Sequence, residues 1–98
     1  MIALVWRYEV REEHRGLFEA TFGPAGECAR LLARSGSFRG AELFRNEDGS
    51  YLKLDVWSDR GAFEDFLAVH GKAYEALDHR TEAWRRAEHR LGEYEVLG

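Results

Sequence analysis

Two side chains in the second half of the sequence, His70 and Asp55, are of the types that remove protons in enzymes. Apolar residues surround His70. An imidazole in such a setting is a neutral, hydrogen-bonded core residue, a general base facing a cavity, or a surface-exposed side chain, and the sequence leaves these interpretations open. A buried imidazole would stay neutral and able to accept a proton.

Large side chains recur around His70 at spacings of three, four and seven residues, which is the period of one helix face. This stripe consists of Phe63, Phe66, Leu67, His70, Tyr74, Leu77 and Trp84. An aromatic stripe at helical spacing either covers a sheet as core packing or lines a pocket. The spacing predicts the helix, and it leaves the function of the stripe open.

Other elements follow from the alternation of apolar and polar residues and from turn signals. We expect strands over residues 2–10, 38–45, 51–57 and 91–98. Helical spacing appears over residues 11–22 and again over 27–34, with a break at Gly23-Pro24 between them. After Ser58 or Asp59 as a cap, we expect helical structure to about Arg90, with Gly71 as a candidate break between a short helix and a longer one.

The resulting order is β, α, β, β, α, β, which matches the ferredoxin-like α+β pattern of an antiparallel sheet with helices on one face. The other sheet face then has no cover. If Trp6 and Tyr8 lie on one face and Asp55 and Trp57 on another, apolar surface stays exposed in the monomer. Packing two such sheets together would bury it, so we expect a homodimer through the sheet face.

Length and charge restrict the class of protein. A chain of 98 residues with 45% hydrophobic content suffices for one domain, residues 1–98. The net charge of -4 argues against nucleic acid as a partner, since phosphate recognition uses clustered cations. The local basic run, Arg85-Arg86 with His89-Arg90, is interspersed with glutamates, which is typical of a solvated helix face.

Cys28 is the only cysteine, which excludes an internal disulfide and a multi-thiolate zinc motif. No H-E-x-x-H pattern is present either, so we expect no metal site. The N-terminal apolar run is too short for a signal peptide or a membrane span. These features together predict a cytoplasmic protein without a membrane partner.

Three runs in the second half of the chain resemble the antibiotic biosynthesis monooxygenase (ABM) domain family, the dimeric α+β barrels. They are YLKLDVWSDRGAFEDF (51–66), KAYEALD (72–78) and EHRLGEYEVL (88–97). The run WRYEVREEHRGLFEATFGPAGECARLL (6–32) resembles the same family in its strand, acidic helix and Gly-Pro-x-Gly break. The resemblance covers nearly the whole chain and implies the fold and the dimeric state.

For function, the resemblance implies a cofactor-independent monooxygenase that acts on a small aromatic or polyketide-like compound and needs neither metal nor flavin. Trp57 would end an inner strand near a cavity between the sheet and the helices. His70 or Asp55 would act as the base, and Tyr74 or Arg39 would hold the oxyanion. The remaining expected substrate contacts are Trp57, Phe63, Phe66 and Trp6.

The sequence also departs from characterised branches of the family. The haem-degrading branch has an Asn in the first strand where this chain has Arg7, a second Trp at the position of Phe66, and its axial His at Ala76. Haem degradation is therefore not expected. The quinone-forming branch shares Trp57, but its Asn four residues earlier is Lys53 here.

Two further functions compete with catalysis. In one, the protein binds a small apolar ligand without chemistry; in the other, it is a structural dimerisation module. A module of that kind would have Trp57, Phe63, Phe66 and Tyr74 packed at interior density.

Overall fold

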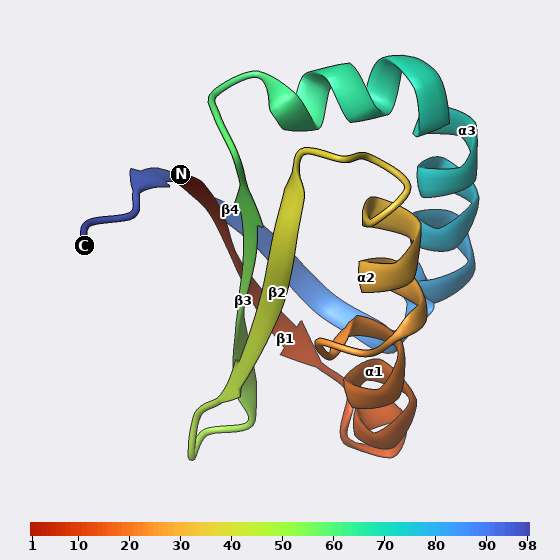
Figure 1. Ribbon diagram of the computed structural model, residues 1–98. Helices are drawn as coiled ribbons and strands as arrows, with labels where there is room; N and C mark the ends of the chain where they lie inside the picture. Colours follow the sequence, from red (N-terminus) through yellow and green to blue (C-terminus); the bar gives the residue numbers. More distant parts are fainter.

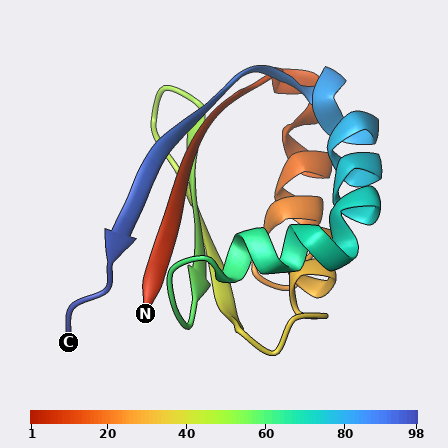
Figure 2. The same cartoon turned by 90° about the horizontal axis from the view of Figure 1, so that it is seen from above.

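Four antiparallel strands form one sheet in the order β2-β3-β1-β4 in the computed structural model, which describes residues 1–98. The strands are β1 (Ile2–Val10), β2 (Phe38–Arg45), β3 (Ser50–Trp57) and β4 (Arg85–Glu95). Helices α1 (Arg15–Phe22), α2 (Glu27–Leu32) and α3 (Ala62–Thr81) all lie on one side of this sheet (Figures 1 and 2). The predicted ferredoxin-like α+β architecture is confirmed.

Strand register decides which side chains the helices cover. In the pairing of β1 with β3, Leu4 lies opposite Asp55 and Trp6 opposite Lys53. Directly opposite residues point to the same face, so Trp6 and Asp55 share the helix-covered face. Tyr8 lies two residues after Trp6 in β1, and Trp57 lies two residues after Asp55 in β3, so both point to the same helix-covered face. The expectation that the two strands bury different faces is therefore wrong.

The break between α1 and α2 lies at Gly23-Pro24, as the sequence indicates. Gly26 then begins α2 in direct contact with the end of α1. A Cβ atom at Gly26 would lie 2.4 Å from the carbonyl oxygens of both Ala20 and Thr21. Only glycine allows this close backbone approach, and it sets α2 against α1.

Helix α3 begins later than predicted. Neither Ser58 nor Asp59 caps it; the N-cap is Gly61, whose φ of 85° is a left-handed conformation that favours glycine. The helix then continues through Gly71 without interruption, although its axis turns sharply about midway (Figures 1 and 2). Neither α3 nor any other helix has the combination of length and apolar content needed to span a membrane.

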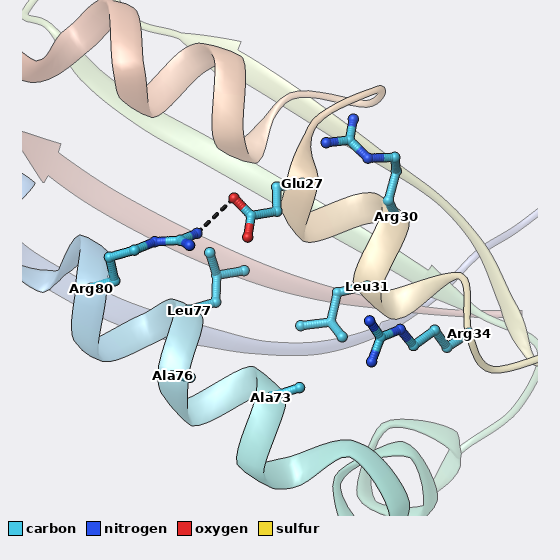
Figure 3. Close-up of a pocket in the computed structure, with 8 residues that line it drawn as sticks. All are labelled: Glu27, Arg30, Leu31, Arg34, Ala73, Ala76, Leu77 and Arg80. Carbon is cyan, nitrogen blue, oxygen red and sulfur yellow. Dashed lines mark hydrogen bonds and ion pairs between the residues drawn. The ribbon is translucent and has the colours of Figure 1, made fainter.

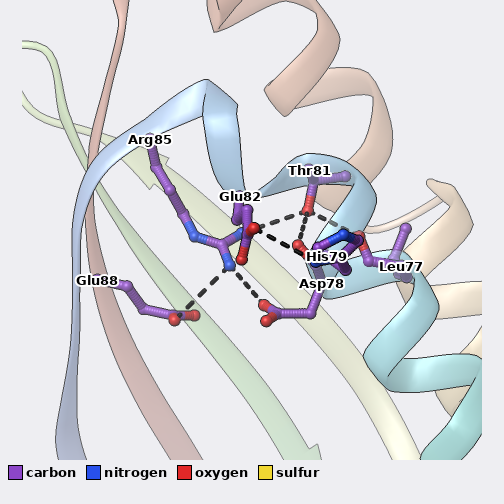
Figure 4. A network of polar contacts seen from close by, with 7 residues as sticks. All are labelled: Leu77, Asp78, His79, Thr81, Glu82, Arg85 and Glu88. Atoms are coloured by element: carbon purple, nitrogen blue, oxygen red, sulfur yellow. Dashed lines mark hydrogen bonds and ion pairs between the residues drawn. The ribbon is translucent and has the colours of Figure 1, made fainter.

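The end of α3 is a second correction, because the helix stops at Thr81 and not near Arg90. Arg85, the first residue of β4, is nearly buried, with 7% of its side chain exposed. Its guanidinium pairs with Asp78 of α3, donates to Thr81 Oγ1 at 3.3 Å and lies 3.8 Å from Glu88 (Figure 4). These contacts hold the start of β4 against the last turn of α3.

Strand β4 therefore includes the basic run that the sequence assigned to a helix face. Arg86, His89 and Arg90 are exposed there on a strand at the sheet edge. The run contains no β-branched residue, which explains why its sequence did not indicate a strand. Two register shifts against β1, between Val5 and Trp6 and between Glu9 and Val10, interrupt the pairing.

The uncovered sheet face is apolar at its centre. Leu52, Leu54 and Val56 of β3 are half-buried there, and Val5 of β1 lies opposite Leu54. Two larger side chains flank them on neighbouring strands: Phe44, 51% exposed, and Tyr94, 53% exposed. These residues form the apolar surface that the helices leave open, whereas Trp6 and Trp57 lie on the opposite, helix-covered face.

Candidate functional site

Aromatic rings from β3 and α3 meet between the sheet and the helices. Trp57, with 1% of its surface exposed, has ring-centroid distances of 5.7 Å to Phe63 and 5.8 Å to Phe66. The ring centroid of Tyr74 lies 5.5 Å from that of Phe63, and the ring centroid of Phe38 in β2 lies 5.2 Å from that of Trp57. The structure thus brings together Trp57, Phe63, Phe66 and Tyr74, and we call these four residues the aromatic cluster.

The rings of the cluster fill the space beside Trp57. Five main hollows on the molecule have volumes from about 290 to about 640 Å³, and two of them are lined in part by other residues of α3. None of the five is lined by a member of the aromatic cluster. A ligand at Trp57 therefore requires side chains to move.

His70 lies at the margin of the cluster, where its ring centroid is 5.2 Å from that of Phe66. The side chain is half-buried and also lines a surface hollow of about 640 Å³ at the turn of α3. One part of the imidazole therefore contacts the cluster while another faces outward.

Asp55 forms an ion pair with Lys53 inside the protein, with side-chain exposures of 4% and 2%. The alternation of β3 points both residues toward the helices, in line with Trp57. Two charges at alternate positions of an otherwise apolar strand were the sequence signal for this pair. Lys53 Nζ already occupies Oδ1 of the Asp55 carboxylate, so this side chain is held in a structural contact.

The buried tyrosines near this pair remain protonated. Burial is the main cause that raises the pKa of Tyr74 above its usual value, and nearby Asp55 adds to it. Burial also raises the pKa of Tyr8, with a further contribution from Glu88. Both phenols can therefore donate a hydrogen bond to a negatively charged oxygen, which is the role that the sequence suggested for Tyr74.

Two indole N–H groups on the helix-covered face have no acceptor. The Nε1 atoms of Trp6 and Trp57 are both buried and have no hydrogen-bond partner. The guanidinium of Arg90 lies 5.5 Å from the ring centroid of Trp6 and covers this half-buried residue from the β4 side. Unpaired buried donors are rare in proteins, and a catalytic role or a bound group is one of the explanations for them.

Arg39 lies apart from these groups. It sits at the register shift between Phe38 and Gly40, where β2 departs from regular pairing with β3. Its side chain is exposed, and its Nη1 donates a hydrogen bond to the carbonyl oxygen of Gly36 at 2.6 Å. The structure does not place Arg39 with Trp57 and Tyr74.

No protein-family model matches this sequence, and no curated protein matches it either. Solved structures do resemble it over nearly its full length. SnoaB, a cofactor-independent oxygenase from Streptomyces nogalater, is 26% identical with a TM-score of 0.66, and the match covers 99% of this chain and 93% of SnoaB.

Two other similar structures have lower identity. An antibiotic biosynthesis monooxygenase is 13% identical with a TM-score of 0.68, and the match covers 100% of both chains. A MhuD mutant with two manganese protoporphyrin IX molecules bound per active site is 22% identical with a TM-score of 0.75, covering 99% of this chain and 95% of MhuD. The chain therefore has the fold of the ABM monooxygenases, as its sequence indicates.

Removal of one partner from the buried ion pair should be costly. We expect Asp55→Ala to lower the free energy of unfolding by about 3–5 kcal/mol, because it leaves the Lys53 ammonium buried and unpaired. Urea unfolding of the variant measures this loss. The matched control is the double variant Lys53→Met with Asp55→Leu, which should recover most of the stability. A double variant as unstable as Asp55→Ala would contradict this account.

Cys28 should make stability depend on pH in the alkaline range. Burial raises the pKa of its thiol from 9.0 to about 11. Between these values the unfolded chain loses the thiol proton first, so stability falls as pH rises, by up to about 2 kcal/mol. Urea unfolding from pH 9 to 11 should show a steeper fall for the natural protein than for Cys28→Ala. Equal slopes would argue against a buried thiol.

Proposed function

We propose that the protein is a cofactor-independent monooxygenase that oxidises a small aromatic or polyketide-like compound beside Trp57. The observation that carries this proposal is the pair of buried indole N–H groups on Trp6 and Trp57 that lack acceptors. SnoaB, an oxygenase of the same fold with 26% identity, supports the reaction class.

The unpaired donors indicate what the substrate offers. A buried donor without a partner costs about 1–3 kcal/mol, so a carbonyl or phenolic oxygen placed against Trp57 Nε1 would remove that cost. The rings of Phe63 and Phe66 supply apolar contacts for an aromatic body. Both residues lie in the first half of α3, and the proposal requires them to move apart when the substrate enters.

The proposed chemistry starts with removal of a proton from an enolic or phenolic substrate. His70 is the better placed of the two predicted bases, because Asp55 is held by Lys53. The resulting anion is electron-rich and reduces dioxygen. One oxygen atom converts a CH₂ group of the substrate to a carbonyl, and the other leaves as water. The protonated Tyr74 donates a hydrogen bond to the anionic oxygen.

A second candidate function is binding of a small apolar ligand without catalysis. The aromatic rings of the cluster support it, because they would supply apolar contacts to such a ligand. Their mutual packing, with ring-centroid distances of 5.5 to 5.8 Å, instead favours the structural dimerisation module. In either case His70 is a structural neighbour of Phe66 and takes no part in proton transfer.

Oxygen consumption tests the first function against the second. We expect turnover of an enolisable aryl ketone such as anthrone, with kcat/KM lowered about tenfold in Trp57→Phe by loss of one hydrogen bond. The matched control is Trp84→Phe, a tryptophan outside the cluster. An oxygen electrode follows turnover, and quenching of tryptophan fluorescence follows binding.

Each outcome has a defined meaning. Quenching without oxygen consumption would overturn the monooxygenase proposal in favour of a binding protein. Absence of both signals with every aryl ketone tested would leave only a structural module. Equal effects of the Trp57 and Trp84 substitutions would remove Trp57 from the substrate site.

We also propose that the protein is a homodimer joined through the uncovered sheet face. The half-buried Leu52, Leu54 and Val56 are apolar, and Phe44 and Tyr94 extend this surface at its margins. Packing a second copy here removes these side chains from water, which favours association.

A charge at the centre of this face should prevent association. Leu54→Glu is expected to yield a monomer of 11.3 kDa where the natural chain yields twice that mass. Leu97→Glu is the matched control, because Leu97 is 85% exposed in the C-terminal tail beyond β4. Size-exclusion chromatography with light scattering distinguishes the species, and a Leu54→Glu dimer would rule out this face.

A further inference from the structure

A groove with a volume of about 460 Å³ lies between α2 and α3, outside the space that holds the aromatic cluster (Figure 3). It is lined by Glu27, Arg30, Leu31, Arg34, Ala73, Ala76, Leu77 and Arg80. Nothing in the sequence spacing indicated this site, because its residues come from two distant segments of the chain, residues 27–34 and 73–80. Its size is within the range of pockets that hold small organic molecules.

The groove has an apolar floor. Leu31 of α2 and Leu77 of α3 are both buried, and they face each other between the two helices in Figure 3. Ala73 and Ala76 provide the α3 wall, and their short side chains keep the groove open. An apolar body would be removed from water here against aliphatic side chains.

The rim of the groove is strongly cationic. Arg30, Arg34 and Arg80 surround it, against one acidic residue, Glu27, in a chain with a net charge of -4. Arg80 is paired with Glu27 at 2.6 Å, and Arg30 donates a hydrogen bond to the Ala25 carbonyl at 2.7 Å. The side chain of Arg34 has neither an ion pair nor a hydrogen bond, so its guanidinium is free to bind an anion.

A neighbouring hollow extends the cationic region. The hollow beside His70, with a volume of about 640 Å³, shares Arg34 and Ala73 with the groove. Lys72 lines it as well, against a single acidic residue, Glu75. Arg34 therefore stands between two concave surfaces that both carry an excess of positive charge.

We propose that this groove binds a small organic carboxylate with an apolar body, anchored by Arg34. The planar guanidinium matches a carboxylate with two parallel hydrogen bonds. Arg30 keeps further N–H donors beyond the one used by Ala25, and it adds positive charge from α2, one turn before Arg34. The hydrocarbon or aryl body lies on Leu31, Leu77 and Ala76.

The apolar floor decides between classes of anion. Inorganic phosphate would gain from the arginines but would leave the leucine and alanine surface without contact. A neutral apolar compound would gain from that surface but would leave Arg34 unpaired. Only a ligand that combines the two properties uses both parts of the groove.

Binding can be followed by NMR titration of the isotope-labelled protein with phenylbutyrate. We expect the amide signals of α2 and the second half of α3 to shift, and Arg34→Gln to weaken binding about tenfold or more. Arg86→Gln is the matched control, since it removes an exposed arginine from β4, and it should change affinity less than about twofold. Ala76→Leu narrows the groove at an exposed position and should also weaken binding.

Four results would overturn the proposal. They are unchanged affinity in Arg34→Gln, equal binding of the neutral phenylbutanol, equal binding of inorganic phosphate, and no shift with either phenylbutyrate or octanoate. Shifts confined to the residues around Trp57 would also contradict it, because the ligand would then occupy the aromatic cluster. The groove and the proposed oxygenase site are thus tested separately.

Discussion

The helix side of the sheet contains one buried ion pair, Lys53 with Asp55, whose two charges must stay together. Removing either charge would leave the other buried without a partner, which is strongly destabilising. The alternation of β3 places them between Tyr51 and Trp57 on the same face. The rest of that face is apolar, so α2 and α3 seal it from water, and the aromatic rings from α3 provide bulk next to Trp57.

This seal gives the molecule two separate chemical environments. Inside, the polar groups are an ion pair, protonated tyrosines and two indole donors, so a ligand would meet donors and aromatic faces. On the outer side of the helices, arginines surround an aliphatic floor, so a ligand would meet fixed positive charge. Leu31 and Leu77 contribute to both environments, because they are core residues that also form the floor of the groove.

Alternation and turn chemistry were sufficient to predict most of the fold. They indicated β1 and β2 with their observed limits and the break at Gly23-Pro24. They failed at β4, where the charged run from Arg85 has no strand composition and its structure depends on contacts with Asp78 and β1. The α3 members of the aromatic cluster, Phe63, Phe66 and Tyr74, were predictable from helical spacing, and the Lys53 ion pair had a signal in the alternation of β3. The unpaired indoles and the arginine groove depend on tertiary contacts that spacing does not encode.

The polar composition of β4 also affects how copies of this chain can meet. This strand forms one free edge of the sheet, and a free edge offers unpaired backbone groups to any extended segment. Along it, Arg86, Glu88 and Arg90 are exposed, so an added strand would have to bring its own side chains up against alternating charges. Edge-to-edge stacking into open-ended aggregates is thereby disfavoured. The sheet can keep an apolar face without the risk of fibril growth along its edge.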